Sequence, residues 1–334
     1  MSTRPWLSIL VPVYNVAPYV QECVASIMDQ WIDGVELLLL DDVSTDNSGA
    51  LIQALCLRYP GRIRLFHHGL NRGLSAARNS LLAEANGRHV WFLDSDDLLC
   101  TGALAALHRI LTAHDPDLVL CDFRMLRSRP QLKYWLRGEG HRHSFGGRPR
   151  RLFSDREQLI TGLLTTAQLH VWTKIARREA WLRAPFPEDR CFEDIAVMPG
   201  LLQATTSVYY EPTPWVAYRQ RDDSIMHTFS EKKVQDLLFS LAQLRGGLLE
   251  KFPSMGVAAR FALDQFCLKS VAASARRSSR EAQARKPELL RMYRESLARL
   301  FPQGIEPVLV RYRQRGWRLR AARIGKTLRQ SGII

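Results

Sequence analysis

Apolar runs alternate with amphipathic stretches along the first 125 residues of this 334-residue chain. Continuous apolar runs are typical of strands buried on both faces of a sheet. The stretches between them repeat apolar residues every three or four positions, as helices that cover a sheet do. The predicted strands span residues 7–15, 35–40, 62–68, 89–93 and 117–122.

The predicted helices carry recognisable end signals. Ser44 or Thr45 is the candidate N-cap of the second helix, and Gly87 closes the third. Ser154 and Glu157 have the spacing of a capping box that opens a later helix. Strand and helix alternation predicts an α/β fold in which a mostly parallel central sheet is flanked by helices on both faces.

Polar residues follow three of the predicted strands. In open parallel sheets, ligands bind beyond the carboxyl ends of the strands, so these polar residues are expected to face one crevice. The three clusters are Tyr14-Asn15, Asp41-Asp42 and Asp94–Asp97.

The third cluster, DSDD, places three carboxylates within four positions. Like charges this close repel each other. One interpretation is that the acids complement the N-terminus of the helix that follows. The other is that a D-x-D at a strand end holds a divalent cation, which takes oxygen ligands and accepts substrate phosphates as partners. The convergence of three polar clusters favours the cation.

The net charge of +14 is distributed unevenly. Residues 231–334 hold 22 of the 47 Lys and Arg residues but 8 of the 33 Asp and Glu residues, so they carry the whole excess. This change coincides with a helical pattern from about residue 232. It predicts a sheet-containing domain over residues 1–230 and a basic α-helical region over residues 231–334. Residues 127–151, rich in Gly, Pro and basic residues, are interpreted as an irregular excursion.

Composition excludes several classes. Apolar runs are far shorter than the ~20 residues of a membrane span. The N-terminus lacks a signal-peptide pattern, and the six cysteines show no C-x-x-C spacing, so a cytoplasmic protein with reduced thiols is expected. Nucleic acid is not an expected partner because the basic charge accompanies no reading motif. A dinucleotide fingerprint after the first strand is also absent.

Seven segments together resemble the family 2 glycosyltransferases, which use nucleotide sugars and have the Rossmann-like GT-A fold. They occur in the family's order across residues 7–227 and are SILVPVYN, LLLLDDVSTDNS, NRGLSAARN, VWFLDSDD, VWTKIARRE, FEDIAV and YRQRDDSIMH. The resemblance implies nucleotide-sugar binding by about residues 1–125 and an acceptor side at about residues 150–230.

The implied activity is a metal-dependent, inverting transfer of a hexosyl or N-acetylhexosaminyl group. The donor would be a nucleotide sugar, with UDP as the expected nucleotide. The acceptor would be a hydroxyl of a growing cell-surface glycan of lipopolysaccharide, capsule or exopolysaccharide type. Two alternatives stay open: a sugar-nucleotide-binding protein without transfer activity, and a nucleotidyltransferase on a similar fold.

The resemblance also assigns donor-binding roles. Tyr14 would lie against the uracil face, Asp42 would accept a hydrogen bond from the base imide, and Arg78 would reach the nucleotide or diphosphate. Val43 stands where the family usually has glycine. The implied nucleotide-sugar-binding residues are Pro12, Tyr14, Asn15, Asp42, Asn71, Arg78, Asp94, Ser95 and Asp96.

The metal and the base are assigned in the same way. Asp96 would bind Mn²⁺ or Mg²⁺ directly, Asp94 would contact the ribose or a metal-bound water, and His227 is a candidate third ligand. Asp194 would take the proton of the acceptor hydroxyl, with Glu193 as its supporting neighbour. An acid pair that complements a helix N-terminus is the alternative for these two residues.

Four residues are assigned to the acceptor side: Trp172, Lys174, Arg219 and Arg221. Trp172 and Lys174 would line the sugar pocket, although a packed core tryptophan is an open alternative. Arg219 or Arg221 would touch the diphosphate.

The C-terminal segment predicts an Arg-rich amphipathic helix. Its apolar positions share one helical face and are Val310, Trp317, Ala321, Ile324 and Leu328. Such a helix suits an anionic membrane surface, which would place the enzyme on the inner face of the cell membrane beside a glycan or lipid-linked glycan acceptor. The alternative is a helix that packs on its own domain.

Overall fold

The apolar runs become strands of one sheet in the computed structural model, which describes residues 4–127, 132, 136–220, 230–281 and 286–334. Two predicted site residues, Arg221 and His227, lie outside the described residues. The strands are β1 (Leu7–Val13), β2 (Val35–Asp41), β3 (Ile63–His67), β4 (His89–Phe92), β5 (Leu98–Leu99), β6 (Leu118–Leu126), β7 (Leu152–Phe153), β8 (Lys174–Arg177) and β9 (Val208–Arg219).

The strand order among these residues is β3-β2-β1-β4-β8-β6-β9-β5, with β7 on β9. The first four strands are mutually parallel. Strand β8 is antiparallel to both β4 and β6, and β9 is parallel to β6. Six of the nine described strands therefore run in one direction, which confirms the prediction of a mostly parallel sheet.

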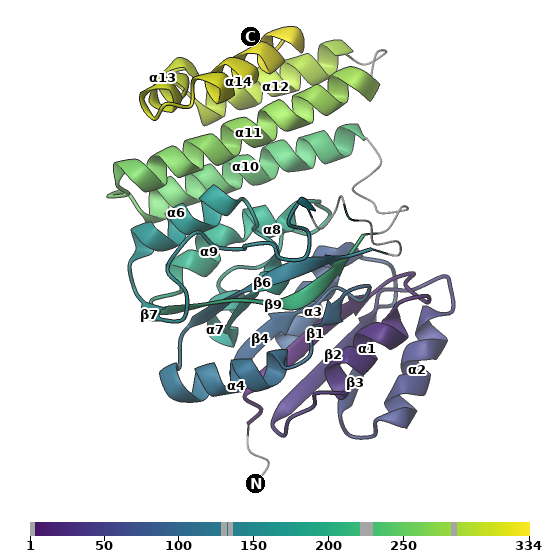
Figure 1. Ribbon diagram of the computed structural model, residues 1–334. Helices are drawn as coiled ribbons and strands as arrows, with labels where there is room; N and C mark the ends of the chain where they lie inside the picture. Colours follow the sequence, from purple (N-terminus) through teal and green to yellow (C-terminus); the bar gives the residue numbers. More distant parts are fainter. Residues whose placement is uncertain (1–3, 128–131, 133–135, 221–229, 282–285) are drawn as a thin grey trace.

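Helices cover both faces of this sheet, as predicted (Figure 1). One face packs on α1 (Val20–Met28), α2 (Ser48–Arg58) and α4 (Ala103–His114). The opposite face packs on α3 (Gly73–Glu84), α6 (Arg156–Thr166), α7 (Arg178–Leu182) and α9 (Met198–Gln203). Two short elements, η1 (Val171–Thr173) and α8 (Glu193–Ala196), connect these parts.

The basic region is helical, as predicted, and stacks on α6, α8 and α9, which separate it from the sheet (Figure 1). Ser230, at the predicted boundary, is the N-cap of the first of these helices and accepts a hydrogen bond from the Lys233 amide. The buried apolar core is continuous from Leu120 of the sheet to Leu241 and Tyr312, so the two predicted parts share one core. The helices are α10 (Glu231–Lys251), α11 (Val257–Glu281), α12 (Lys286–Leu300), α13 (Glu306–Gln314) and α14 (Arg318–Gln330).

The predicted helix ends were displaced by a few residues. Asn47, and neither Ser44 nor Thr45, is the N-cap of α2. The N-cap of α6 is Asp155, whose carboxylate accepts from the Gln158 amide at 3.0 Å. Helix α3 ends at Glu84.

Gly87 has a different role from the predicted helix end. A Cβ atom at this position would lie 2.4 Å from the Ser8 amide nitrogen, so glycine permits the close approach of the chain to β1.

The predicted C-terminal amphipathic helix is two helices. Gly316, at φ 77°, separates α13 from α14. Trp317 packs against Phe261 and Tyr312, and Leu328 is buried in the shared core. Most of the apolar face is therefore buried by packing on the rest of the chain, as the alternative interpretation predicted. Val310 is an exception, at 37% exposed.

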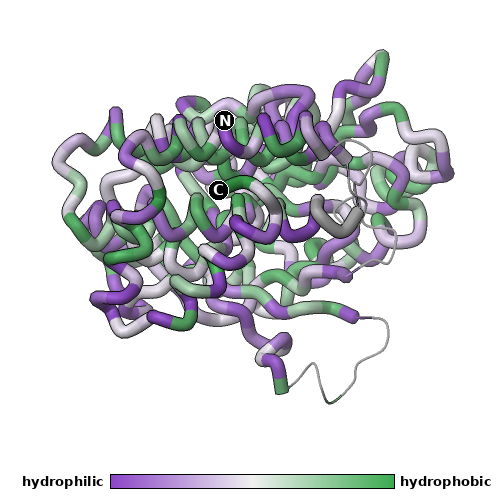
Figure 2. The backbone as a smooth tube through the Cα atoms, turned by 90° about the horizontal axis from the view of Figure 1, so that it is seen from above, coloured by the Kyte–Doolittle hydropathy of each residue, from purple (hydrophilic) through white to green (hydrophobic). Residues whose placement is uncertain are grey.

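Figure 2 looks down onto the C-terminal end of the molecule, where hydrophilic and hydrophobic residues alternate along the chain. Within the described parts of the chain, every helix is too short or too polar to cross a bilayer.

Candidate functional site

The three polar clusters lie at one edge of the sheet. Strands β2, β1 and β4 are adjacent and parallel, so the residues that follow them are neighbours in space. The Asp42 amide donates to the Val13 carbonyl at 2.9 Å, which ties the end of β2 to the end of β1. The three predicted clusters are therefore neighbours at the carboxyl ends of adjacent strands.

Asp42 is buried at the N-terminus of α3. Its carboxylate accepts hydrogen bonds from the backbone amides of Arg72 at 2.9 Å and Gly73 at 2.7 Å. His68 Nδ1 lies 2.6 Å from Oδ1, and Asn71 donates to the Asp42 carbonyl at 2.8 Å. A carboxylate has about four acceptor positions, and these contacts occupy three of them, so one position on Oδ2 stays open among the described residues.

The loop after β1 interlocks with the loop after β2. Asn15, at φ 51°, accepts through its side-chain oxygen from the Thr45 amide at 2.8 Å. Val43 adopts φ 62°, a conformation that costs a β-branched residue energy and that glycine adopts freely. The turn thus keeps the backbone that the family's glycine allows.

Two further residues that were predicted to bind the nucleotide sugar differ in their exposure to solvent. Tyr14 is 47% exposed at the sheet edge, so its ring is available for stacking on a base. Pro12 is buried in β1 and pairs in register with Leu40. Pro12 is therefore part of the buried strand that leads to Tyr14.

Arg78 joins the two acidic halves of the site. Its buried guanidinium donates to Asp94 Oδ1 at 2.7 Å and to Glu193 Oε1 at 2.5 Å, and it lies over the Phe186 ring. In this structure, both outer nitrogens of the arginine therefore hold carboxylates. The contact brings α8 against the end of β4, so the acid pair of α8 faces the D-x-D.

Asp97 is the most deeply buried acid of the DSDD turn. It is fully buried, and its Oδ1 accepts from the Arg219 amide at 2.8 Å. Its Oδ2 lacks a hydrogen-bond partner among the described residues. Burial, followed by the charges of Asp96 and Asp94, raises its pKa well above the usual value.

The negative charge of this turn fits a hard divalent cation. Every side-chain atom of the cluster that could bind a metal is a carboxylate or hydroxyl oxygen. Ser95, between the two acids of the D-x-D, is buried in the turn.

Arg219 supports the D-x-D turn from behind. Its Nε donates to the Asp96 carbonyl at 2.8 Å, and its guanidinium pairs with Glu22 at 2.6 Å and lies over the Tyr19 ring. The predicted contact of Arg219 with a diphosphate would require these interactions to be exchanged.

The acid pair of α8 has two different environments. Glu193 is buried against Arg78, whereas Asp194 is partly exposed and lies 3.8 Å from His170 Nδ1. Burial raises the pKa of the Asp194 carboxyl, while Arg78 and Lys174 oppose that shift. A carboxylate with raised proton affinity that reaches solvent is suited to accept a proton.

The two predicted pocket residues Trp172 and Lys174 are buried. Trp172 stacks against both His170 and Tyr218, with ring centroids 4.6 and 5.4 Å away, and these two rings lie 6.0 Å from each other. Lys174 donates through Nζ to the carbonyls of Gln168 and His170, and burial lowers its pKa to about 7. Both side chains are therefore buried next to the site. For Trp172, this burial matches the alternative of a packed core tryptophan.

Sequence reasoning missed His170 and Tyr218, which form the exposed part of this aromatic stack. His170 directly precedes the segment VWTKIARRE, so its position beside a recognised motif was the available signal. Tyr218 was inside a recognised segment but was passed over for its arginine neighbour.

Comparisons with known sequences agree with this geometry. The glycosyl transferase family 2 pattern matches residues 8–170. Glycosyltransferase GlyG of Streptococcus pneumoniae is 25% identical over 233 residues, which are 66% of this chain and 73% of GlyG. The minor teichoic acid biosynthesis protein GgaB of Bacillus subtilis is 34% identical over 113 residues, which are 33% of this chain but 12% of GgaB.

Solved structures show the same fold. S. aureus TarS 1–349 in complex with UDP-GlcNAc superposes with a TM-score of 0.72 at 18% identity, covering 97% of this chain and 91% of that chain. Mannosyltransferase PcManGT from Pyrobaculum calidifontis, in complex with GDP-Man and Mn²⁺, gives 0.52 at 18% identity, covering 99% and 88%. Residues 8–170 of this chain thus match glycosyl transferase family 2, and the whole chain has the GT-A-like fold of these solved glycosyltransferase structures.

Proposed function

We propose that this enzyme transfers a sugar from a UDP-sugar to a hydroxyl of a cell-surface glycan, with inversion and with a divalent cation. The observation that carries the proposal is the double ion pair of Arg78 with Asp94 and Glu193. This contact joins the D-x-D edge of the sheet to α8. It supports a site in which donor and base share one crevice.

The donor proposal rests on the exposed ring of Tyr14 and the remaining acceptor position of Asp42. An aromatic face stacks on any base, whereas a carboxylate that accepts an imide N–H favours uracil. The TarS structure with UDP-GlcNAc supports a UDP-sugar, and the name of GgaB supports a cell-wall type of acceptor.

The cation would be held by Asp96 and Asp94. The Mn²⁺ in the PcManGT structure supports this choice. Such an ion supplies positive charge that offsets the charge on a leaving nucleoside diphosphate. His227, the third proposed ligand, lies outside the described residues.

Asp194 is proposed as the base. Glu193 holds Arg78 and so fixes the start of α8, which leaves its partly exposed neighbour to meet the acceptor hydroxyl. The raised pKa of Asp194 favours proton uptake at the moment the hydroxyl attacks the sugar. His170 and Tyr218 would form an aromatic wall for the acceptor sugar.

A thermal-shift screen of nucleotide sugars tests the donor. UDP-sugars with Mn²⁺ should raise the melting temperature, because ligands that bind the native state stabilise it. The shift should be smaller without Mn²⁺ and in Asp96→Ala. Stabilisation by GDP- or dTDP-sugars instead of UDP-sugars would contradict the donor assignment.

A further inference from the structure

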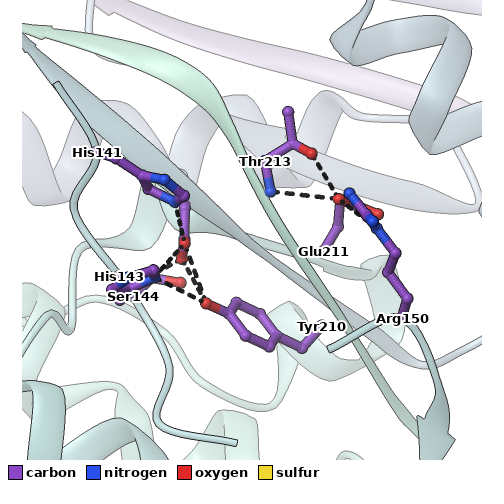
Figure 3. A network of polar contacts seen from close by, with 8 residues as sticks. His141, His143, Ser144, Arg150, Tyr210, Glu211 and Thr213 are labelled. Carbon is purple, nitrogen blue, oxygen red and sulfur yellow. Dashed lines mark hydrogen bonds and ion pairs between the residues drawn. The ribbon is translucent and has the colours of Figure 1, made fainter. Parts of the chain in front are cut away.

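A second cluster of metal-ligating side chains lies on β6, outside the donor site. Asp122 is fully buried, and its Oδ2 lies 2.8 Å from both His141 Nε2 and His143 Nδ1. Figure 3 shows the two histidines converging with Ser144 and Tyr210. The three ligand atoms lie within 4.8 Å of one another, a spacing that one metal ion can bridge.

The local backbone explains why these residues meet. The register between β6 and β9 shifts on both sides of Asp122, and such a bulge re-aims a side chain. Phe123 and Arg142 form an antiparallel bridge. Because side chains alternate along extended chain, His141 and His143 flank Arg142 and point to the same side, toward Asp122.

We propose that Asp122, His141 and His143 bind Zn²⁺. Two imidazole nitrogens and one carboxylate oxygen are a common protein ligand set for this ion, with a solvent molecule in the fourth position. The histidines are exposed, His143 to 64% of its side chain, so an ion can reach them. On binding, the ring nitrogens that now face Asp122 present lone pairs to the metal in place of protons.

The carboxylate is already oriented by other groups. The Ser144 amide donates to Asp122 Oδ1 at 2.8 Å, and the Tyr210 hydroxyl lies 3.0 Å from both carboxylate oxygens. Outer partners that orient a ligand tune metal affinity by about 10- to 100-fold. These contacts prearrange Asp122 and distinguish the cluster from two histidines that merely approach an acid.

The site differs from the D-x-D in its donor atoms. Nitrogen donors suit Zn²⁺, whereas the oxygen donors of Asp94 and Asp96 suit Mn²⁺ or Mg²⁺. Bound Zn²⁺ would fasten residues 141–143 to β6. The next residue of β6, Phe123, packs edge-on against Trp172 and His170, so the clip would brace the aromatic stack beside Asp194.

The test is calorimetric titration of Zn²⁺ into the full-length, chelator-stripped protein. One tight site is expected, and it should persist in Asp96→Ala, which separates it from the D-x-D. His141→Ala and His143→Ala should each weaken binding by about 100-fold, and Tyr210→Phe by about 10-fold. His114→Ala, which removes another exposed histidine with an aromatic neighbour, should leave affinity unchanged.

Cobalt substitution provides a second readout. Co²⁺ bound to the wild type should give visible absorption bands that His143→Ala lacks, and circular dichroism of the metal-free variant should match the wild type. Equal Zn²⁺ affinity in wild type, His141→Ala and His143→Ala would overturn the proposal. Loss of tight binding in Asp96→Ala alone would also overturn it.

Discussion

At the scale of residues, one buried guanidinium holds the candidate active site together. The resemblance implies that Arg78 reaches the nucleotide or diphosphate, and in the structure its guanidinium lies between Asp94 and Glu193. Removing one partner from a buried ion pair leaves an uncompensated charge, which costs far more than the loss of an exposed pair. Arg78 therefore serves stability as well as geometry.

The first prediction concerns this residue. Arg78→Met should lower the free energy of unfolding by about 3 kcal/mol, because two carboxylates lose their buried counter-charge. Arg72→Met, which breaks the exposed pair with Glu188, should cost less than about 1 kcal/mol. Urea unfolding of both variants measures the difference. Equal losses of unfolding free energy in the two variants would show that the buried ion pairs stabilise the protein no more than the exposed pair does.

At the scale of elements, titratable side chains lie at both ends of β4. The D-x-D follows its carboxyl end, and the buried His89 begins it, with Nε2 lying 2.9 Å from the Pro116 carbonyl. Burial lowers the pKa of His89 to about 4, and the charges of Arg177 and Arg88 contribute. The imidazole of His89 is therefore neutral at neutral pH.

The second prediction follows from the sign of this shift. Between about pH 6.5, the usual pKa of histidine, and the lowered value, the unfolded chain binds a proton that the native state lacks. His89 therefore costs stability as pH falls through this window. In His89→Gln, the stability difference from the wild type should shift in favour of the variant as pH falls. A difference that is constant with pH would contradict the lowered pKa.

The elements also show what sequence could predict. Strands β1, β2 and β4 were predicted because each is a mainly apolar run next to helical patterns, which is a local signal. The antiparallel insertion of β8 between β4 and β6 depends on pairing between distant segments, which no local pattern reports. Helix ends were misplaced because several capping residues adjoin each start, and packing chooses among them.

The candidate site divides along the same line. Tyr14, Asp42 and the D-x-D were predicted to meet because they follow neighbouring parallel strands. The contact of Arg78 with Glu193 spans 115 residues and required the folded chain. His141 and His143 lie in a segment that was interpreted as irregular. The bulge and the bridge that align them with Asp122 are tertiary features, so the cluster was missed.

At the scale of the whole molecule, the boundary between the neutral and basic parts of the chain is not a boundary of the apolar core. The excess charge begins after residue 230, whereas the apolar core continues into α10–α14. The packing of Trp317 and Leu328 leaves the outer surface of α14 basic. Its exposed cations are Arg318, Arg320, Arg323, Lys326 and Arg329.

The third prediction concerns this surface. Because the apolar face is packed inside, attraction to anionic vesicles should be electrostatic and should disappear at high salt. The triple variant Arg318→Gln, Arg320→Gln, Arg323→Gln should co-sediment with anionic vesicles several-fold less than the wild type. The matched control removes exposed arginines on the opposite side of the sheet: Arg58→Gln, Arg62→Gln and Arg109→Gln. Salt-resistant binding, or equal losses in both triple variants, would contradict this account.

The most direct test of the central claim is UDP release from the UDP-sugar that the thermal-shift screen identifies, with Mn²⁺ and with water or a glycan as acceptor. Asp194→Asn should remain folded and lose at least about 100-fold in rate, because the attacking hydroxyl lacks its base. Glu188→Gln, an exposed acid before α8, should match the wild type. Full activity of Asp194→Asn would contradict the assignment of Asp194 as the base.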